Sequence, residues 1–244
     1  MPADASTSAQ RPSRPPIRDP HLVPVVGHDG HLPAIPDDRL VPEALRARLA
    51  RVDGWQAPIS GDGARPEWFG DRPATAASVL VPLVQRPNEL HVLLTRRTDH
   101  LHDHAGQISF PGGRAEPSDA DAVATALREA EEEVGLLHHQ VDVIGHLPTY
   151  TTVTRFVVTP VVALVRPDYT LDLDDFEVAE AFEVPLRYLM DPAHHQHHEF
   201  AFGGATRRFL SMPWRPGHGD PREYFIWGAT ASMLRNLYHL LSTD

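Results

Sequence analysis

The sequence of 244 residues contains no cysteine and no lysine, and all 22 of its basic residues are arginine. Without cysteine the chain has no disulfide framework, no thiolate zinc site and no cysteine nucleophile. Without lysine it has no Schiff base, no P-loop lysine and no kinase-type lysine. A serine hydrolase with a Gly-x-Ser-x-Gly elbow is excluded too, because that segment is missing. Any chemistry that the chain performs must therefore use carboxylates, histidines, arginines, hydroxyls or a bound metal ion.

A basic surface and a long apolar run are also lacking. The formal net charge is -11, which argues against broad binding to a phosphate backbone. No apolar run approaches the roughly 18 residues of a membrane span, and the first residues lack the basic-then-apolar pattern of a signal peptide. We therefore expect a cytoplasmic protein that acts on a small molecule, with neither nucleic acid nor a membrane as a partner. A homodimer is left open.

Composition divides the chain into three segments. Eight of the 24 prolines fall within residues 2–36 without apolar periodicity, so residues 1–40 are predicted to be a disordered tail. Residues 41–72 are expected to form an accessory amphipathic helix, with Leu45, Leu49 and Val52 on one side, followed by a linker. Residues 73–244 then form the main domain.

The main domain shows alternating strand and helix patterns. Residues 78–84 and 90–95 read as a hairpin around the turn-forming residues 86–88. Further strands are predicted at 141–147, 155–165, 199–202 and 207–212. Helices are predicted at 119–134 and 228–241, and the second has a core-facing apolar stripe. This order favours an α/β or α+β layered domain with a mixed sheet.

The segment from Leu127 to Leu136 places three carboxylates on one side of a helix. At about 100° per residue, Glu129, Glu132 and Glu133 fall within about 100° of one another. Carboxylates this close repel unless a cation lies between them, and Mg²⁺ and Mn²⁺ prefer such oxygen ligands. The alternative is an acidic helix face that is merely solvated.

The loop before this helix, residues 109–114 (SFPGGR), contains paired glycines that permit tight turns and close backbone approach to a ligand. Together with the helix, it resembles the Nudix hydrolase family. The family's box is Gly, five residues, Glu, seven residues, then Arg-Glu-aliphatic-x-Glu-Glu-x-Gly-aliphatic. Its second half is matched by Arg128, Glu129, Glu132, Glu133, Gly135 and Leu136. The first half departs from the box, because Asp119 replaces Glu and eight residues separate it from Arg128.

Upstream residues narrow the resemblance. Residues 93–97 (LLTRR), Gly106 and residues 110–113 (FPGG) are similar to the extra motif of Nudix enzymes that cleave coenzyme A. Residues 226–231 (IWGATA) also resemble that subfamily, so the likeness covers roughly residues 73–241. Thr98 stands where serine or alanine is usual, and His102 where an arginine is expected, so His102 would replace that positive charge only when protonated.

The resemblance implies a fold and a set of site residues. The fold is an α/β/α sandwich with a mixed central sheet, a catalytic helix after a Gly-rich loop and a C-terminal packing helix. The implied ligands of Mg²⁺ or Mn²⁺ are Glu129, Glu132, Glu133 and the Gly113 carbonyl. The residues expected to contact substrate are Arg96, Arg97, His102, Phe110, Gly112 and Arg114.

Two assignments stay open at this point. The general base is Glu132 or Glu129 from the box, or a later glutamate such as Glu177 in the acidic run 172–183. Arg128 is predicted to be structural, paired with Asp119 or with Glu116.

The sixteen histidines include three groups: residues 100, 102 and 104, the pair at 138 and 139, and residues 194, 195, 197 and 198. Those at residues 100, 102 and 104 precede the glycine loop and are expected to face substrate. Those at residues 194, 195, 197 and 198 lie in a Pro/His/Gln-rich stretch, and an exposed loop is favoured for them over a metal site.

Three functions follow, in order of preference. The first is metal-dependent hydrolysis of coenzyme A or acyl-CoA at the diphosphate, which gives 3′,5′-ADP and (acyl-)phosphopantetheine. The second is a Nudix hydrolase of ADP-ribose or NADH-type substrates. The third is a Nudix-like binding or regulatory module without catalysis, although such modules commonly lose box glutamates and this chain keeps all three.

Overall fold

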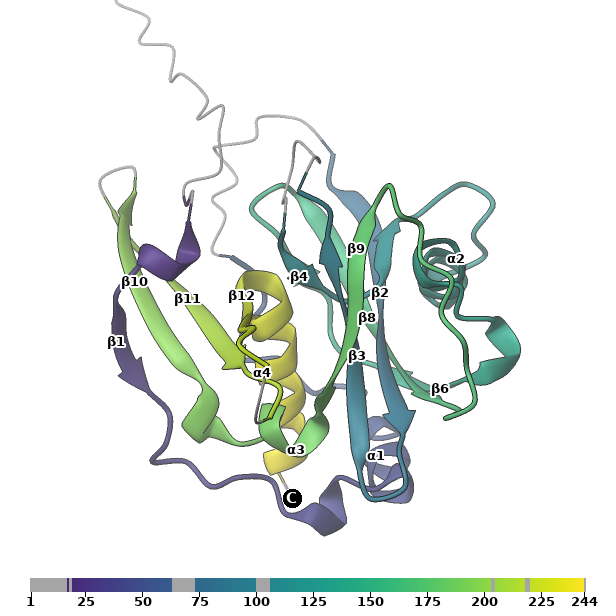
Figure 1. The fold of residues 1–244 in the computed structure, drawn as a ribbon, viewed down its shortest axis with the longest axis horizontal. Helices are drawn as coiled ribbons and strands as arrows, with labels where there is room; N and C mark the ends of the chain where they lie inside the picture. Colours follow the sequence, from purple (N-terminus) through teal and green to yellow (C-terminus); the bar gives the residue numbers. More distant parts are fainter. Residues whose placement is uncertain are drawn as a thin grey trace, which may run out of the picture.

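The computed structural model describes residues 17, 19–62, 73–99, 106–202, 205–217 and 220–243. In these residues two β-sheets flank a C-terminal helix, and a further helix covers the far side of the larger sheet (Figure 1). The helices are α1 (Pro42–Leu49), α2 (Ala122–Val134), α3 (Leu186–Leu189) and α4 (Gly228–Ser242).

The larger sheet is mixed and carries the glycine loop. Its main path runs β4-β3-β2-β8-β6, with β5 paired to β2, β7 to β8 and β9 to β3. The bounds are β2 (Thr75–Gln85), β3 (Leu90–Arg97), β4 (Ile108–Ser109), β5 (Gly112–Arg114), β6 (Val141–His146), β7 (Tyr150–Thr151), β8 (Phe156–Val165) and β9 (Val178–Pro185).

Helix α2 covers one face of this sheet as part of the crossover between β2 and β8, which pair in parallel. Leu80, Leu93 and Val161 from the strands are buried against Ala130 and Val134 of the helix. The strand residues form continuous β-branched and apolar runs because the opposite face is covered too. The apolar stripe of α2 thus faces the sheet and leaves its carboxylates beside the glycine loop.

The smaller sheet has the strand order β1-β10-β11-β12. Buried Met212 and Ile226 from this sheet share one core with Leu234 and Leu237 of α4. Helix α1 contributes Leu45 to the same core. The strands of the smaller sheet are β1 (Val25–His28), β10 (Gln196–Phe202), β11 (Ala205–Trp214) and β12 (Tyr224–Trp227).

The predicted fold class is confirmed. The hairpin forms as β2 and β3, and both predicted long helices are present as α2 and α4. Helix α2 begins three residues later than predicted, because the Asp121 carboxylate accepts a hydrogen bond from the Ala124 amide and caps the helix. No helix of the described segments is both long and apolar enough to span a membrane.

The predicted disordered tail is wrong for its described part. Strand β1, within residues 1–40, pairs antiparallel with β10, and the Ile35 and Leu40 side chains are buried in the core. Proline-rich composition misled the prediction because β1 gains its hydrogen bonds from a strand about 170 residues later in the chain. Residues 1–16 and 18 lie outside the described part, as do residues 63–72 of the predicted linker.

Candidate functional site

The glycine loop brings its backbone against the carboxylates of α2. Gly112 has φ +152°, and a Cβ there would lie 2.4 Å from the Ser78 carbonyl oxygen, so the position requires glycine. Its amide donates a 3.0 Å hydrogen bond to Glu133 Oε2. A Cβ on Gly113 would lie 2.6 Å from Glu129 Oε2. The two glycines therefore let the Glu129 and Glu133 carboxylates lie directly against the loop.

The three box glutamates differ in exposure. The Glu133 side chain is 7% exposed, that of Glu129 is 16% exposed and that of Glu132 is 60% exposed. Burial raises the pKa of Glu133 to about 7 and also raises the pKa of Glu129. The helix ends at Gly135 in the left-handed conformation. The predicted acidic face thus contains one buried, one half-buried and one exposed carboxylate.

Arg128 connects the box glutamates to Asp119, which precedes helix α2. Its Nε lies 3.0 Å from Asp119 Oδ1 and its Nη2 lies 3.0 Å from Asp119 Oδ2. The same guanidinium lies 3.1 Å from Glu129 Oε1 and 2.8 Å from Glu132 Oε2. Hydrogen bonding to Arg128 lowers the pKa of Asp119 well below its ordinary value. Of the two acids predicted to pair with Arg128, it is Asp119 that does so, and Glu116 donates its backbone N–H to Asp119.

Arg97 joins the box to a later acid. Its Nη1 lies 3.6 Å from Glu133 Oε1 and its Nη2 lies 3.4 Å from Glu177 Oε2. The segment that carries Glu177 is fixed to the end of β3, because the Thr98 amide donates to the Glu177 carbonyl and the Thr98 hydroxyl to the Phe176 carbonyl. The structure thus brings Glu177 beside the box, and Thr98 explains how.

Arg96 faces the other side of the sheet. Consecutive strand residues point to opposite faces, and Arg96 pairs across the ladder with Glu180, its Nε 3.5 Å from Glu180 Oε2. The two arginines that the sequence grouped together are therefore separated. Arg97 lies with the box carboxylates and Arg96 does not.

The NUDIX domain profile matches residues 74–202 of the chain. The chain belongs to the Nudix hydrolase family. It is 43% identical to the Nudix hydrolase NudL of Escherichia coli K12 over 162 residues, which is 66% of this chain and 80% of that protein. It is 42% identical to NudL of Yersinia enterocolitica over 161 residues, 66% of this chain and 78% of that protein.

Solved Nudix structures also resemble the chain. The Nudix hydrolase RenU of M. smegmatis covers 50% of this chain and 78% of its own length, with a TM-score of 0.42 and 23% identity. The C. elegans Ap4A hydrolase covers 49% of this chain and 85% of its own length, with a TM-score of 0.40 and 19% identity. Nudix hydrolases act on phosphoric anhydrides and generally use divalent metal ions.

The donor chemistry of the Nudix box fits such an ion. Glu129, Glu132 and Glu133 offer only oxygen atoms, and Gly113 leaves its backbone beside Glu129 with no side chain between them. Among the described residues, no three Asp, Glu or His side chains already converge as a metal-binding group. Arg97 and Arg128 contact the carboxylates instead.

The remaining predicted residues are Phe110, Arg114 and His102. The Phe110 ring is 2% exposed within the core, so its predicted substrate contact is replaced by a packing role. Arg114 is exposed at the end of β5. His102 lies outside the described residues, together with the histidines at 100 and 104.

The exposed loop predicted for the late histidines is wrong for two of them. His195 is 0% exposed, and its ring lies 2.8 Å from the Leu189 carbonyl and 2.8 Å from Arg235 Nη1. His198 is 2% exposed and contacts the Ser211 hydroxyl. Burial lowers the pKa of His195 to about 4. These histidines belong to the core of the smaller sheet.

Proposed function

We propose that the chain is a metal-dependent hydrolase of coenzyme A or acyl-CoA that cleaves the diphosphate to 3′,5′-ADP and (acyl-)phosphopantetheine. The observation that carries the proposal is the junction between Arg97 and Glu133. Arg97 belongs to the LLTRR segment shared with coenzyme A-cleaving members, and Glu133 belongs to the Nudix box. The substrate motif and the carboxylates therefore meet in one place.

Glu129, Glu132 and Glu133, with the Gly113 carbonyl, would hold Mg²⁺ or Mn²⁺. When bound, the ion would neutralise the phosphate oxygens and activate water for attack. Arg128 keeps the Glu129 and Glu132 carboxylates oriented through its own contacts. Arg97 and the Gly112 amide position Glu133, and Arg97 and Arg114 are proposed to contact the anionic substrate.

Glu132 and Glu177 are the proposed candidates for the general base, with Glu132 preferred. Both have water-accessible carboxylates, 60% exposed for Glu132 and 42% for Glu177. Glu129 is half-buried beside Arg128, so a ligand role suits it better. A base has to reach the attacking water, and the two exposed acids satisfy that requirement.

We also propose that residues 73–244 form the catalytic domain, that residues 41–72 are an accessory element, and that the protein acts in the cytoplasm. The acidic net charge and the lack of cysteine support this setting.

Product analysis tests the function. The protein is incubated with Mg²⁺ or Mn²⁺ and, separately, with coenzyme A, acetyl-CoA, ADP-ribose, NADH and a dinucleoside polyphosphate, and the products are separated chromatographically. We expect 3′,5′-ADP and phosphopantetheine from coenzyme A, and no product in EDTA. Preferential turnover of ADP-ribose would transfer the assignment to that substrate, and no turnover at all would favour a binding module. Running the reaction in ¹⁸O water identifies the phosphorus that is attacked.

A further inference from the structure

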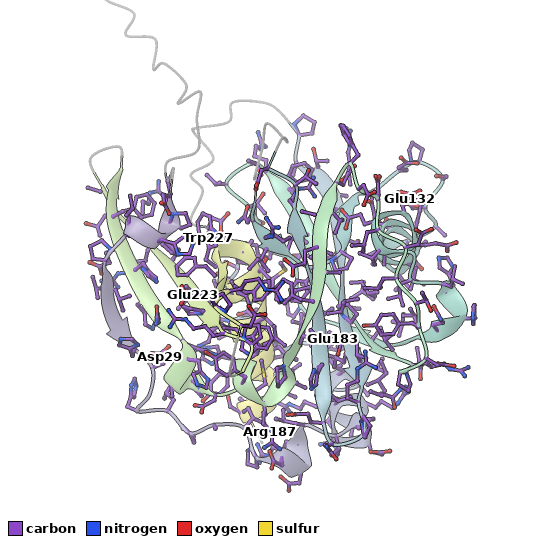
Figure 2. The ribbon with its side chains drawn as sticks, viewed as in Figure 1. Asp29, Glu132, Glu183, Arg187, Glu223 and Trp227 are labelled. Atoms are coloured by element: carbon purple, nitrogen blue, oxygen red, sulfur yellow. The ribbon has the colours of Figure 1, made fainter. Side chains whose placement is uncertain are left out.

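A cavity of about 420 Å³ lies between the end of β3 and strand β12 of the smaller sheet. Its lining includes Arg96 and Glu180 from the larger sheet and Phe225 and Trp227 from the smaller sheet. Figure 2 shows Trp227 and Glu223 on the side of β9 that faces the smaller sheet, with Glu132 on the other side. The cavity is thus distinct from the cluster of box carboxylates.

The smaller sheet contributes the aromatic residues Phe225 and Trp227 to the lining of this cavity. Phe225 and Trp227 are two residues apart on β12, so their rings lie on the same face of the sheet. Each ring is held by a neighbour: His21 lies 4.4 Å from Phe225 and Phe209 lies 5.3 Å from Trp227, measured between centroids. Both rings are half-buried. The two rings are therefore fixed in place and suit contact with another planar ring.

The charged residues that line the cavity are compensated by partners of opposite charge. Glu180 accepts a 2.6 Å hydrogen bond from the Tyr224 hydroxyl and is paired with both Arg96 and Arg222. Glu223 lies 2.6 Å from Arg215. A phosphate would have to displace these carboxylates from their guanidinium partners. An uncharged ligand that both donates and accepts hydrogen bonds fits these residues better.

The cavity adjoins the catalytic side through the end of β3. Arg96 lines the cavity, whereas the next residue, Arg97, contacts Glu133. Gly106 and Ile108 also line it, and the chain continues from Ile108 through β4 into the glycine loop. A ligand bound against Trp227 therefore lies next to the strand end that leads to the box carboxylates.

We propose that this cavity binds the adenine ring of the substrate. The proposal rests on the proposed function, since it requires a substrate that carries an adenine nucleotide. The ring stacks on Trp227 and Phe225, its exocyclic amine donates to the Glu180 carboxylate, and Arg96 donates to a ring nitrogen. A 6-oxo purine is rejected because its carbonyl oxygen faces the Glu180 carboxylate without a proton between them.

Calorimetric titration of the full chain with 5′-AMP and with 5′-IMP in EDTA tests the site without turnover. We expect 5′-AMP to bind more tightly than 5′-IMP. Trp227→Ala should weaken 5′-AMP binding by about 10-fold or more, and Trp227→Phe should restore most of it. Glu180→Gln should reduce or reverse the preference for 5′-AMP, because its amide can donate to a 6-oxo group. Glu199→Gln, on the β10–β11 hairpin, is the charge-matched control and should change neither affinity.

The outcomes separate this proposal from the proposed function. Trp227-dependent binding of 5′-AMP without cleavage of coenzyme A would support the ring site and reject the substrate. Cleavage of coenzyme A with a KM that Trp227→Ala and Glu180→Gln both leave unchanged would reject the ring site alone. Absence of 5′-AMP binding to the wild-type chain would also reject it. Circular dichroism shows whether Trp227→Ala is folded. If it is not, the proposal is tested by Glu180→Gln, which should reduce or reverse the preference for 5′-AMP over 5′-IMP, and an unchanged preference would reject the ring site.

Discussion

Arg128 and Asp119 form a two-pronged ion pair, with Nε–Oδ1 and Nη2–Oδ2 distances that are both 3.0 Å. The aspartate is shorter than the family's glutamate and lies one residue further from the arginine, yet its carboxylate still faces the guanidinium. The same guanidinium contacts Glu129 and Glu132. Arg128 therefore still orients the box carboxylates, although the sequence departs from the Nudix box at Asp119.

Asp119→Asn should lower kcat/KM by about 10- to 100-fold, the usual effect of losing a residue that orients metal ligands. The lost charge leaves Arg128 free to swing toward Glu129 and Glu132. Steady-state kinetics at several Mg²⁺ concentrations measures the effect, and we expect a higher Mg²⁺ requirement. Glu116→Gln is the matched control and should behave as wild type. An equal loss in both variants would contradict the pairing described here.

Glu132→Gln should lower kcat by about 100-fold or more, because it removes a metal ligand or the base. If Glu132 is the base, Glu177→Gln should lower kcat less than Glu132→Gln does. If Glu177 is the base, Glu177→Gln should lower kcat more. Product formation measured at fixed times in both variants distinguishes the two bases. Glu131→Gln, an exposed acid on the same helix, is the control and should keep full activity. Unchanged turnover in Glu132→Gln would exclude the mechanism proposed for the box.

Replacing the two loop glycines by alanine should affect different properties, stability for Gly112 and activity for Gly113. Gly112→Ala places a Cβ 2.4 Å from the Ser78 carbonyl oxygen at φ +152°, so it should lower the free energy of unfolding by about 1–3 kcal/mol. Gly113→Ala pushes only the Glu129 carboxylate, so it should lower activity more than stability. Urea unfolding and kcat on the same samples separate the two effects. Gly217→Ala, with nothing within 4 Å, should change neither.

His195 predicts a stability that falls in acid. Burial beside Arg235 lowers its pKa from 6.5 to about 4, so between these pH values the unfolded chain binds a proton that the folded chain does not. This contribution is complete above about pH 6.5 and is lost as the pH falls toward 4, by about 3 kcal/mol in total. Burial lowers the pKa values of His198 and His239 as well, which acts in the same direction.

Urea unfolding at intervals from pH 4.5 to 7.5 measures that slope. His195→Gln should flatten it, whereas His139→Gln, which is exposed, should not. The raised pKa values of Glu133 and Glu129 contribute a slope of the opposite sign, so the test is the difference between wild type and His195→Gln. A slope that His195→Gln leaves unchanged would contradict the assignment.

The sequence predicted elements whose pattern is local. Helix α2 follows from its apolar stripe and its Nudix spacing, and the β2–β3 hairpin follows from two β-branched runs around a turn. Strand β9 was not predicted, because most of it lies in the acidic run 172–183, which was considered only as a source of the general base. Glu180 faces Arg96 and Tyr224, which lie far away in the chain, so no local signal could identify its partners.

The same limit applies to the site. Glu129, Glu132 and Glu133 could be grouped from helical spacing alone. The separation of Arg96 from Arg97 required knowing which face of β3 meets α2, and the burial of His195 depends on Arg235, 40 residues later. Phe225 and Trp227 lie on a four-residue strand, which is too short for its alternation of buried and exposed side chains to be recognised in the sequence.

The contact between Arg97 and Glu177 joins residues 80 positions apart and depends on the pairing of β9 with β3. During synthesis from the N-terminus, helix α2 leaves the ribosome well before residues 178–185 do. A nascent chain would then hold the acidic helix without its later glutamate partner. The Arg97–Glu177 contact is therefore formed late in the synthesis of each molecule, and any agent that slows the docking of β9 would delay this contact without changing the box itself.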